Sequence, residues 1–270
     1  MLMRTIKISQ IQFQANSTPD DNCRQLENYF KKALKYKPDI ICTPECSNLI
    51  TNDKKHLFKF STYQKDCPIL NMSKKFAKKY KVSINIGSLL LKVKSQKKLI
   101  NRSFLINKDG LIKTFYDKIH MFDVKISKNE YYMESNSFSP GKKIKLIKFK
   151  NTKMGLTICY DLRFPYLFRE LSKKGSEIIL MPAAFTATTG KDHWEVLVRA
   201  RAIENNAYLI ATNMCGVHHA NRKTYGHSLL VDPWGKIINR AYNMPKILNT
   251  KIDLDKVKKD RKKIPSLLHG

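Results

Sequence analysis

The amino-acid sequence predicts an α/β fold built from layered sheets and helices. Apolar strand patterns alternate with helical patterns along the whole chain. Two strand pairs are joined by tight turns, at Lys108-Asp109-Gly110 and at 232–235, so the sheets must contain antiparallel neighbours and be mixed. Several strands are apolar throughout and need cover on both faces. Two mixed sheets packed together, with helices outside each, satisfy these requirements. No repeat or linker interrupts residues 1–270, so we expect a single domain.

The elements of the first half each have a local signal. The stretch 5–13 alternates apolar and polar residues, as a half-buried strand does. A helix over Asp20–Tyr36 begins at the start signal Pro19-Asp20. A second helix is predicted over Asp66–Tyr80 by its helical spacing. The remaining strands of this half are predicted at 39–45, at 82–91 and in the hairpin 99–118.

The second half continues the alternation. A helix over Phe164–Lys174 is ended by Gly175, and a helix over Trp194–Asn206 lies between two apolar strands. The strands of this half are predicted at 143–149, 153–159, 177–185, 207–214 and in the hairpin 226–239. A short strand and a basic helix complete the chain.

Composition narrows the class of protein. With 42% hydrophobic residues the chain is typical of a globular protein, and it has no apolar run near the roughly 20 residues that span a bilayer. The polar, alternating N-terminus is unlike a signal peptide, so a cytoplasmic protein is expected. The cysteines show no paired spacing and the histidines no HExxH pattern, so we predict no disulfide framework, no metal and no cofactor. The adjacent His218 and His219 are interpreted as surface loop residues.

The formal net charge of +29 permits two interpretations. Binding to nucleic acid or to an anionic membrane is one. A lysine-rich solvated surface is favoured, because only ten of the 51 basic residues are Arg and the lysines are spread along the whole chain. We therefore expect no nucleic-acid or membrane partner and keep a basic nucleic-acid-binding protein as the alternative outside enzymes. In either case a positive field attracts anionic small molecules.

Three segments carry side chains suited to catalysis. Cys159 ends a strand and precedes a helix, a turn that projects a nucleophile into a cleft; a buried structural cysteine is the alternative. Glu45 follows a buried strand, where an ordinary turn carboxylate would also fit. Lys118 lies among apolar residues directly after a strand and could stabilise an oxyanion, although a lysine that only reaches solvent is the usual case.

These segments, TPEC, YDKIHMFD and ICYDLRFP, resemble the nitrilase (carbon–nitrogen hydrolase) superfamily, and the similarity extends over essentially the whole chain. The resemblance implies a four-layer α-β-β-α sandwich that forms a homodimer or a higher homo-oligomer, through the helices after Cys159 and after Trp194. It also implies a Glu45–Lys118–Cys159 triad. Glu45 would be the general base, Cys159 the nucleophile that forms a thioester, and Lys118 the oxyanion stabiliser.

The same resemblance suggests further site residues. The backbone N–H of Tyr160 would help Lys118 to stabilise the oxyanion. Glu134, which precedes Phe-Ser-Pro-Gly, resembles a second, assisting glutamate. Cys46, beside Glu45, is interpreted as structural.

Several segments are similar to the Nit branch, including HMFDV, ESNS, CYDLRFP and VDPWG. This similarity implies a Cys-dependent amidase that releases ammonia from the terminal amide of an α-keto acid, with deaminated glutathione first and 2-oxoglutaramate second. Nitriles and N-carbamoyl compounds remain alternatives. The stretch after Glu45, residues 46–58, departs from the branch pattern, which leaves the substrate open.

An anionic substrate needs a fixed positive partner, and the positions after two strands offer candidates. Arg163 is the candidate for binding a carboxylate, with an ordinary ion pair at a helix start as the alternative. Thr188 and Thr189 are expected in a loop over the pocket or in the first turn of the next helix. Arg199 and Arg201 are interpreted as structural and interfacial, because Glu195 lies four residues before Arg199 on the same helix face.

Overall fold

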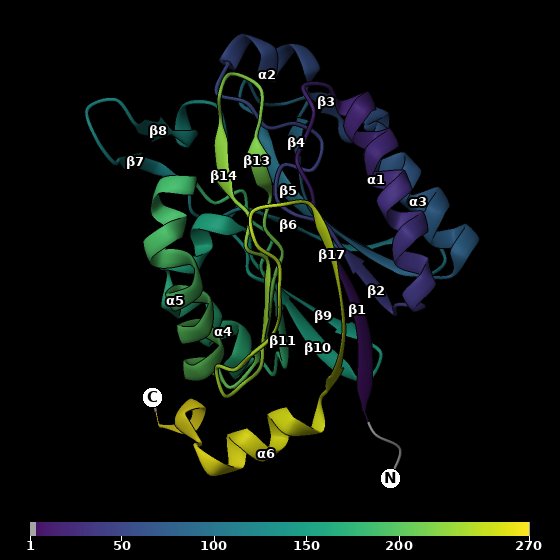
Figure 1. The fold of residues 1–270 in the computed structure, drawn as a ribbon, viewed down its shortest axis with the longest axis vertical. Helices are drawn as coiled ribbons and strands as arrows, with labels where there is room; N and C mark the ends of the chain where they lie inside the picture. Colours follow the sequence, from purple (N-terminus) through teal and green to yellow (C-terminus); the bar gives the residue numbers. More distant parts are fainter. Residues whose placement is uncertain (1–3, 270) are drawn as a thin grey trace.

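The computed structural model describes residues 4–269, and these form two mixed sheets. The first sheet has the strand order β17-β1-β2-β4-β5-β6, with the short β3 paired to β4; the second has the order β16-β15-β12-β11-β10-β9. Figure 1 shows α1 and α3 on one side of the strands and α4 and α5 on the other. The predicted α-β-β-α order of layers is therefore confirmed.

The elements have the following bounds. The strands of the first sheet are β1 (Thr5–Gln12), β2 (Ile40–Cys42), β3 (Thr62–Tyr63), β4 (Ser83–Lys92), β5 (Ile100–Ile106), β6 (Ile112–Asp117) and β17 (Lys246–Asp253). Those of the second are β9 (Lys145–Phe149), β10 (Thr152–Leu156), β11 (Ile178–Leu180), β12 (Tyr208–Ala211), β15 (Leu229–Val231) and β16 (Ile237–Arg240). The separate hairpins are β7 (Asp123–Lys125) with β8 (Tyr131–Met133) and β13 (Cys215–Val217) with β14 (Lys223–Tyr225). The α-helices are α1 (Pro19–Ala33), α2 (Lys54–Phe60), α3 (Pro68–Tyr80), α4 (Pro165–Lys173), α5 (Ala187–Asn205) and α6 (Asp255–Lys263).

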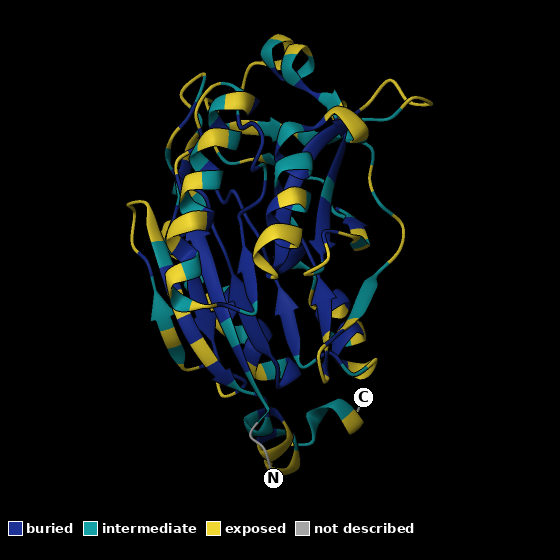
Figure 2. Cartoon of the chain, turned by 90° about the vertical axis from the view of Figure 1, so that its right-hand side faces the viewer, coloured by how far each residue is buried: buried dark blue, intermediate teal, exposed yellow. Residues whose placement is uncertain are grey.

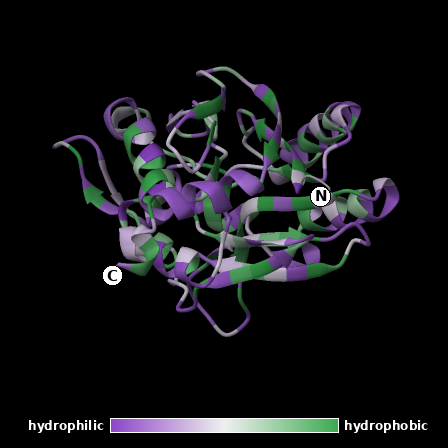
Figure 3. Cartoon of the chain, turned by 90° about the horizontal axis from the view of Figure 1, so that it is seen from below, coloured by the Kyte–Doolittle hydropathy of each residue, from purple (hydrophilic) through white to green (hydrophobic). Residues whose placement is uncertain are grey.

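Apolar side chains fill the three spaces between the four layers. One cluster lies between α1, α3 and the first sheet, and includes Phe30, Phe76 and Phe104. A second joins α4 and α5 to the second sheet around Trp194. A third, with Ile8, lies between the two sheets. Figure 2 shows the strands as the buried centre and the outer helix faces as exposed. Seen from below, the outer elements alternate between hydrophilic and hydrophobic residues (Figure 3).

Several helices begin or end at other residues than predicted, and capping residues and prolines determine two of these positions. The helix at 20–36 ends as α1 at Ala33, and a 3₁₀ turn covers Leu34–Tyr36. α3 begins at Pro68, because proline lacks the N–H that a helix interior needs but fits its first turn. α5 begins at Ala187, seven residues before the predicted start, since the Thr186 hydroxyl accepts the N–H of Thr189 and caps the helix.

Several short elements had no pattern of their own in the sequence. α2, β3 and the strands of the hairpins β7–β8 and β13–β14 are each at most seven residues long, too short for a clear period. α2 and the two hairpins gather at one end of the molecule (Figure 1). A bridge between Thr51 and His219 joins the segment before α2 to the β13–β14 loop. Among residues 4–269, no helix combines the length and apolarity needed to cross a membrane.

Candidate active site

Glu45, Lys118 and Cys159 line one cavity of about 430 Å³. Glu45 follows β2, Lys118 follows β6 and Cys159 follows β10, so both sheets contribute. Glu45 and Lys118 are 3% and 2% exposed and Cys159 is 8% exposed, which places the three side chains at the inner end of the cavity. The exposed residues of the lining mark its mouth, and they are Asn52–Lys54, Asn129, Tyr131 and Met133.

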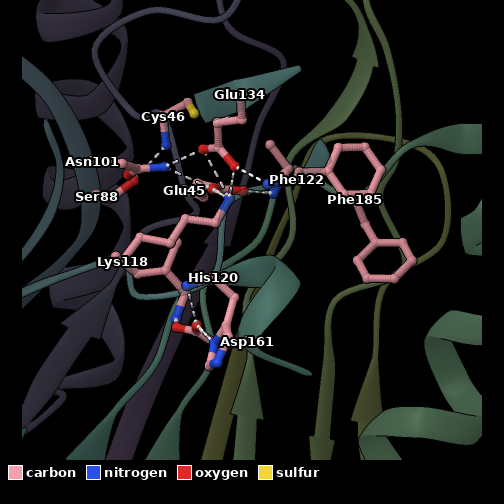
Figure 4. Close-up of polar contacts among 12 residues, drawn as sticks. Glu45, Cys46, Ser88, Asn101, Lys118, His120, Phe122, Glu134, Asp161 and Phe185 are labelled. Atoms are coloured by element: carbon pink, nitrogen blue, oxygen red, sulfur yellow. Dashed lines mark hydrogen bonds and ion pairs between the residues drawn. The ribbon is translucent and has the colours of Figure 1, made fainter. Parts of the chain in front are cut away.

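The Lys118 ammonium lies between two carboxylates (Figure 4). Its Nζ donates to Glu45 Oε1 at 2.9 Å and to both Glu134 oxygens, at 3.0 and 2.8 Å. Asn101 Nδ2 donates to the same Glu45 oxygen at 2.9 Å. The N–H of Phe122 donates to Glu134 Oε2 at 2.6 Å. The structure thus brings Glu134, the residue suggested by similarity alone, into contact with the lysine.

The surroundings fix the charge of each group. Burial would raise the pKa of Glu45, but the Lys118 charge and hydrogen bonds from Lys118, Cys159 and the Ala184 N–H hold it below its ordinary value. Burial would lower the pKa of Lys118, but Glu134 and Glu45 hold it well above its ordinary range. Burial and the Glu45 charge raise the pKa of the Cys159 thiol, against the opposing effect of Lys118. At neutral pH the site therefore holds a carboxylate, an ammonium and a protonated thiol that hydrogen-bonds to the carboxylate.

Cys159 has a left-handed backbone conformation, with φ at +48°. Such a conformation is uncommon for a residue with a Cβ and needs support from its surroundings. Its N–H donates to Pro182 O at 2.8 Å, and a 3₁₀ turn over Cys159–Arg163 follows at once. The predicted strand 153–159 therefore ends early, at Leu156, and the cysteine starts the turn.

Asp161 stabilises this turn through hydrogen bonds. Its Oδ2 accepts the Ile158 N–H at 2.8 Å and the Tyr116 hydroxyl at 2.7 Å. Its Oδ1 accepts from His120 Nδ1 at 2.6 Å, and the His120 ring stacks on Phe164 at 3.6 Å. Sequence reasoning missed Asp161 and His120. The motif YDKIH contains His120 and the motif CYDLR contains Asp161, but only the fold shows that the two side chains are in contact.

The predicted substrate-binding residues divide between the cavity and its surroundings. Tyr160 and Thr189 line the cavity, whereas Thr188 does not: its hydroxyl donates to Glu130 Oε2 at 2.8 Å. Both threonines lie in the first turn of α5, so the prediction of a loop over the pocket is wrong and the helix alternative is correct. Arg163 is not among the lining residues. Its guanidinium lies 5.5 Å from the Phe185 ring centroid and is hydrogen-bonded to His193, not to an acid.

Other predicted residues have structural surroundings. Arg199 pairs with Glu195, as the spacing predicted, and Arg201 Nε donates to Leu162 O at 2.9 Å. Cys46 lines the cavity, with its N–H bound to Ser88 Oγ at 2.9 Å. His218 is buried, so its interpretation as a surface residue is wrong.

Comparisons with known proteins show the family of this chain. The model of the family "Carbon-nitrogen hydrolase" matches residues 7–262. A deaminated glutathione amidase of Yersinia enterocolitica is 36% identical over 270 residues, which cover 99% of this chain and 94% of that protein. The NitFhit protein of C. elegans has a TM-score of 0.93 and 31% identity, over 100% of this chain and 66% of its own. Saccharomyces cerevisiae Nit3, a member of branch 10 of the nitrilase superfamily, has a TM-score of 0.87 and 28% identity, over 97% of this chain and 94% of its own.

Proposed function

This chain belongs to the carbon–nitrogen hydrolase family and is a hydrolase of carbon–nitrogen bonds in amides, and we propose that it acts through a thioester formed on Cys159. The observation that carries the proposal is the convergence of Glu45, Lys118 and Cys159 in one cavity. A protonated thiol that hydrogen-bonds to a carboxylate with a lowered pKa is arranged for proton transfer at the moment of attack.

The first half-reaction follows from these charges. Glu45 accepts the thiol proton as Sγ bonds to the amide carbon, and the carbonyl oxygen becomes an oxyanion. Lys118 and the N–H of Tyr160 stabilise that oxyanion, and burial makes their effect larger than it would be in water. When the tetrahedral intermediate collapses, the carbon–nitrogen bond breaks. Glu45 returns its proton to the leaving nitrogen, and the acyl group stays on Cys159.

The second half-reaction reuses the same base. Glu45 removes a proton from water, the resulting hydroxide attacks the thioester carbon, and the acid leaves as the thiol is restored. Glu134 supports both steps by fixing the Lys118 ammonium with two hydrogen bonds and by keeping it charged. Glu134 is thus assigned to position Lys118, beside the triad.

We propose deaminated glutathione as the substrate, on the strength of relatives such as the Yersinia protein that bear its name. Deaminated glutathione has lost its free amine and keeps only secondary amides. The leaving group from that substrate is therefore an amine. The ammonia expected from the sequence would be released from 2-oxoglutaramate, which has a primary amide. An open, partly polar mouth with room outside the triad favours the longer substrate.

The test compares hydrolysis of deaminated glutathione, 2-oxoglutaramate, an aliphatic nitrile and an N-carbamoyl amine. Cys159→Ser is expected to lower kcat for the preferred substrate by about three orders of magnitude or more. Cys23→Ser, a cysteine on α1 outside the cavity, is the matched control and should retain activity. Equal rates for the wild type and Cys159→Ser would contradict the covalent mechanism, and a preference for the nitrile would contradict the substrate.

Mass spectrometry gives a second readout. A reaction with excess substrate that is stopped during turnover by a rapid acid quench should leave the mass of the acyl group on a peptide that contains Cys159, because acid protonates Glu45 and stops hydrolysis of the thioester that has already formed.

A further inference from the structure

Arg222 stands at the mouth of the cavity and forms no ion pair with an acid among residues 4–269. It precedes β14 and lines the cavity, beside the exposed Asn221 and Lys223. Its guanidinium carbon lies 4.1 Å from the centroid of the Tyr132 ring, which is a cation–π contact. The guanidinium thus lies against an aromatic side chain of the cavity lining, beside the space that a substrate would fill.

One nitrogen of that guanidinium is buried and unsatisfied. Nη1 of Arg222 has no hydrogen-bond partner among residues 4–269, although almost none of its surface is exposed. Leaving a buried donor of a charged group unpaired costs about 1–3 kcal/mol or more. That nitrogen is closed to the cavity in this conformation, so a ligand would first meet the part of the Arg222 side chain that lines the cavity, and a small rotation of the guanidinium would let Nη1 donate to it as well.

The acids near the mouth do not neutralise Arg222. Glu130 accepts from the Tyr132 hydroxyl at 3.1 Å and from Thr188 at 2.8 Å, and within the described chain it forms no ion pair with Arg222. Asp53 accepts the N–H groups of Lys55 and His56 as the cap of α2. The positive charge of Arg222 is thus available to a ligand.

A row of aromatic rings separates Arg222 from the nucleophile. The Tyr132 ring lies 5.2 Å from Phe122, and Phe122 lies 5.0 Å from Tyr160, the residue that follows Cys159. A group bound at Arg222 is therefore several bonds away from a carbonyl held at Cys159. At the inner end, Glu45 and Glu134 already surround Lys118 and would repel a second carboxylate.

We propose that Arg222 binds a carboxylate on the leaving-amine side of the substrate, so that the enzyme selects long amides whose amine portion is anionic over short ones. The proposal rests on the proposed function. The acyl portion must stay on Cys159, whereas the amine portion leaves through the mouth where Arg222 lies. Deaminated glutathione fits this description, because its chain ends in a carboxylate on the amine side of either amide.

The experiment combines Arg222→Met with a change in the substrate. Kinetics are measured on deaminated glutathione, on its glycine methyl ester and on 2-oxoglutaramate, which has no carboxylate on the amine side. Arg222→Met should raise KM for the free acid about 10- to 100-fold and leave its kcat within about threefold. KM for the ester and for 2-oxoglutaramate should change less than about threefold in the same variant.

Two further proteins separate binding from structure. Arg222→Lys keeps the charge and should recover part of the affinity for the free acid. Arg24→Met, an exposed arginine on α1, is the matched control and should behave as the wild type. An equal loss on all three substrates, or an unchanged KM for the free acid, would overturn the proposal, since the first result indicates a purely structural role and the second no contact.

Binding to the inactive Cys159→Ser protein distinguishes this proposal from the proposed function. Calorimetry should give tighter binding of the free acid than of the ester, and Arg222→Met should abolish the difference. A wild type without amidase activity would contradict the proposed function, and this binding comparison would still decide whether Arg222 holds a carboxylate. Equal binding of acid and ester by the protein with Arg222 intact would overturn the inference.

Discussion

At the scale of single residues, the site depends on how burial and charge oppose each other. Lys118 is almost fully buried and would lose its charge if it were alone, yet Glu45 and Glu134 keep it protonated. Its charge in turn keeps Glu45 a carboxylate, the form that can take a proton from Cys159. Replacing one member therefore changes the protonation of the others, which is why the three groups act as a unit.

His218 gives a residue-scale prediction about pH. Burial lowers the pKa of His218 from its ordinary 6.5 to about 4, with Arg222 adding to the effect. The unfolded chain binds the proton more tightly, so this contribution to stability is complete above about pH 6.5 and is lost as the pH falls toward 4. The loss amounts to about 3 kcal/mol once both states are protonated.

Urea unfolding between pH 4.5 and 7.5 measures this effect. His218→Asn should flatten the decline in the free energy of unfolding with acid, even if it is less stable at pH 7. His269→Asn, an exposed histidine near the C-terminus, is the control and should keep the wild-type slope. A slope that His218→Asn leaves unchanged would show that another group causes the acid sensitivity.

At the scale of elements, the turn after β2 packs closely against β4. Ideal Cβ geometry at Gly87 would place that atom 2.1 Å from Thr43 O and 2.4 Å from Pro44 O, both of them backbone atoms. Only glycine lets the two segments approach so closely. The Thr43 hydroxyl also accepts the Gly87 N–H at 3.0 Å, so the contact fixes the turn that presents Glu45.

Gly87→Ala should therefore shift that turn. We expect a loss of about 1–3 kcal/mol in the free energy of unfolding and a fall in kcat of at least tenfold, because Glu45 moves away from Cys159. Urea unfolding and amidase kinetics measure the two effects. Gly155→Ala is the comparison: the nearest atoms to its Cβ would belong to the Leu171 side chain, the closest at 2.9 Å, so stability should fall more than activity. Wild-type activity in Gly87→Ala would show that the turn adapts.

At the scale of the whole molecule, we propose that two chains pair through α4 and α5. Both helices expose large apolar side chains, with Tyr166 at 57%, Val196 at 65% and Ile203 at 48% exposure. Apolar groups gathered on neighbouring helices are typical of an interface, whereas single ones are ordinary. A net charge of +29 opposes association, so the interface must compensate for that repulsion.

Sedimentation at equilibrium tests this proposal. The wild type should behave as a dimer near neutral pH, and Val196→Glu should raise the dissociation constant by at least about tenfold, because it buries an unpaired carboxylate. Lys191→Glu also places an acid on α5, at an exposed position five residues before Val196, and should remain dimeric. A wild type that sediments as a monomer at micromolar concentration would contradict the proposal.

The sequence by itself was sufficient for the layered α/β fold and for most of its long elements, because periodicity and strand ends are local properties. A periodic pattern does not locate a helix end that depends on a single cap, such as Thr186 before α5. It also does not predict elements as short as α2. The triad could be named in advance only because its three motifs resemble a family. Spacing alone left each residue with an ordinary alternative.

Only the tertiary structure decided which charges meet when they lie far apart in the sequence. Glu134 and Lys118 lie sixteen residues apart in the sequence, and Arg222 and Tyr132 lie ninety residues apart. No local pattern could therefore pair them. Whether a lysine is buried between two acids, or an arginine has an unpaired nitrogen, depends on the packing of side chains from both sheets. The sequence thus determined what chemistry the residues could perform, and the fold determined their protonation and which of them face the cavity, because desolvation and Coulomb interactions depend on distance in space.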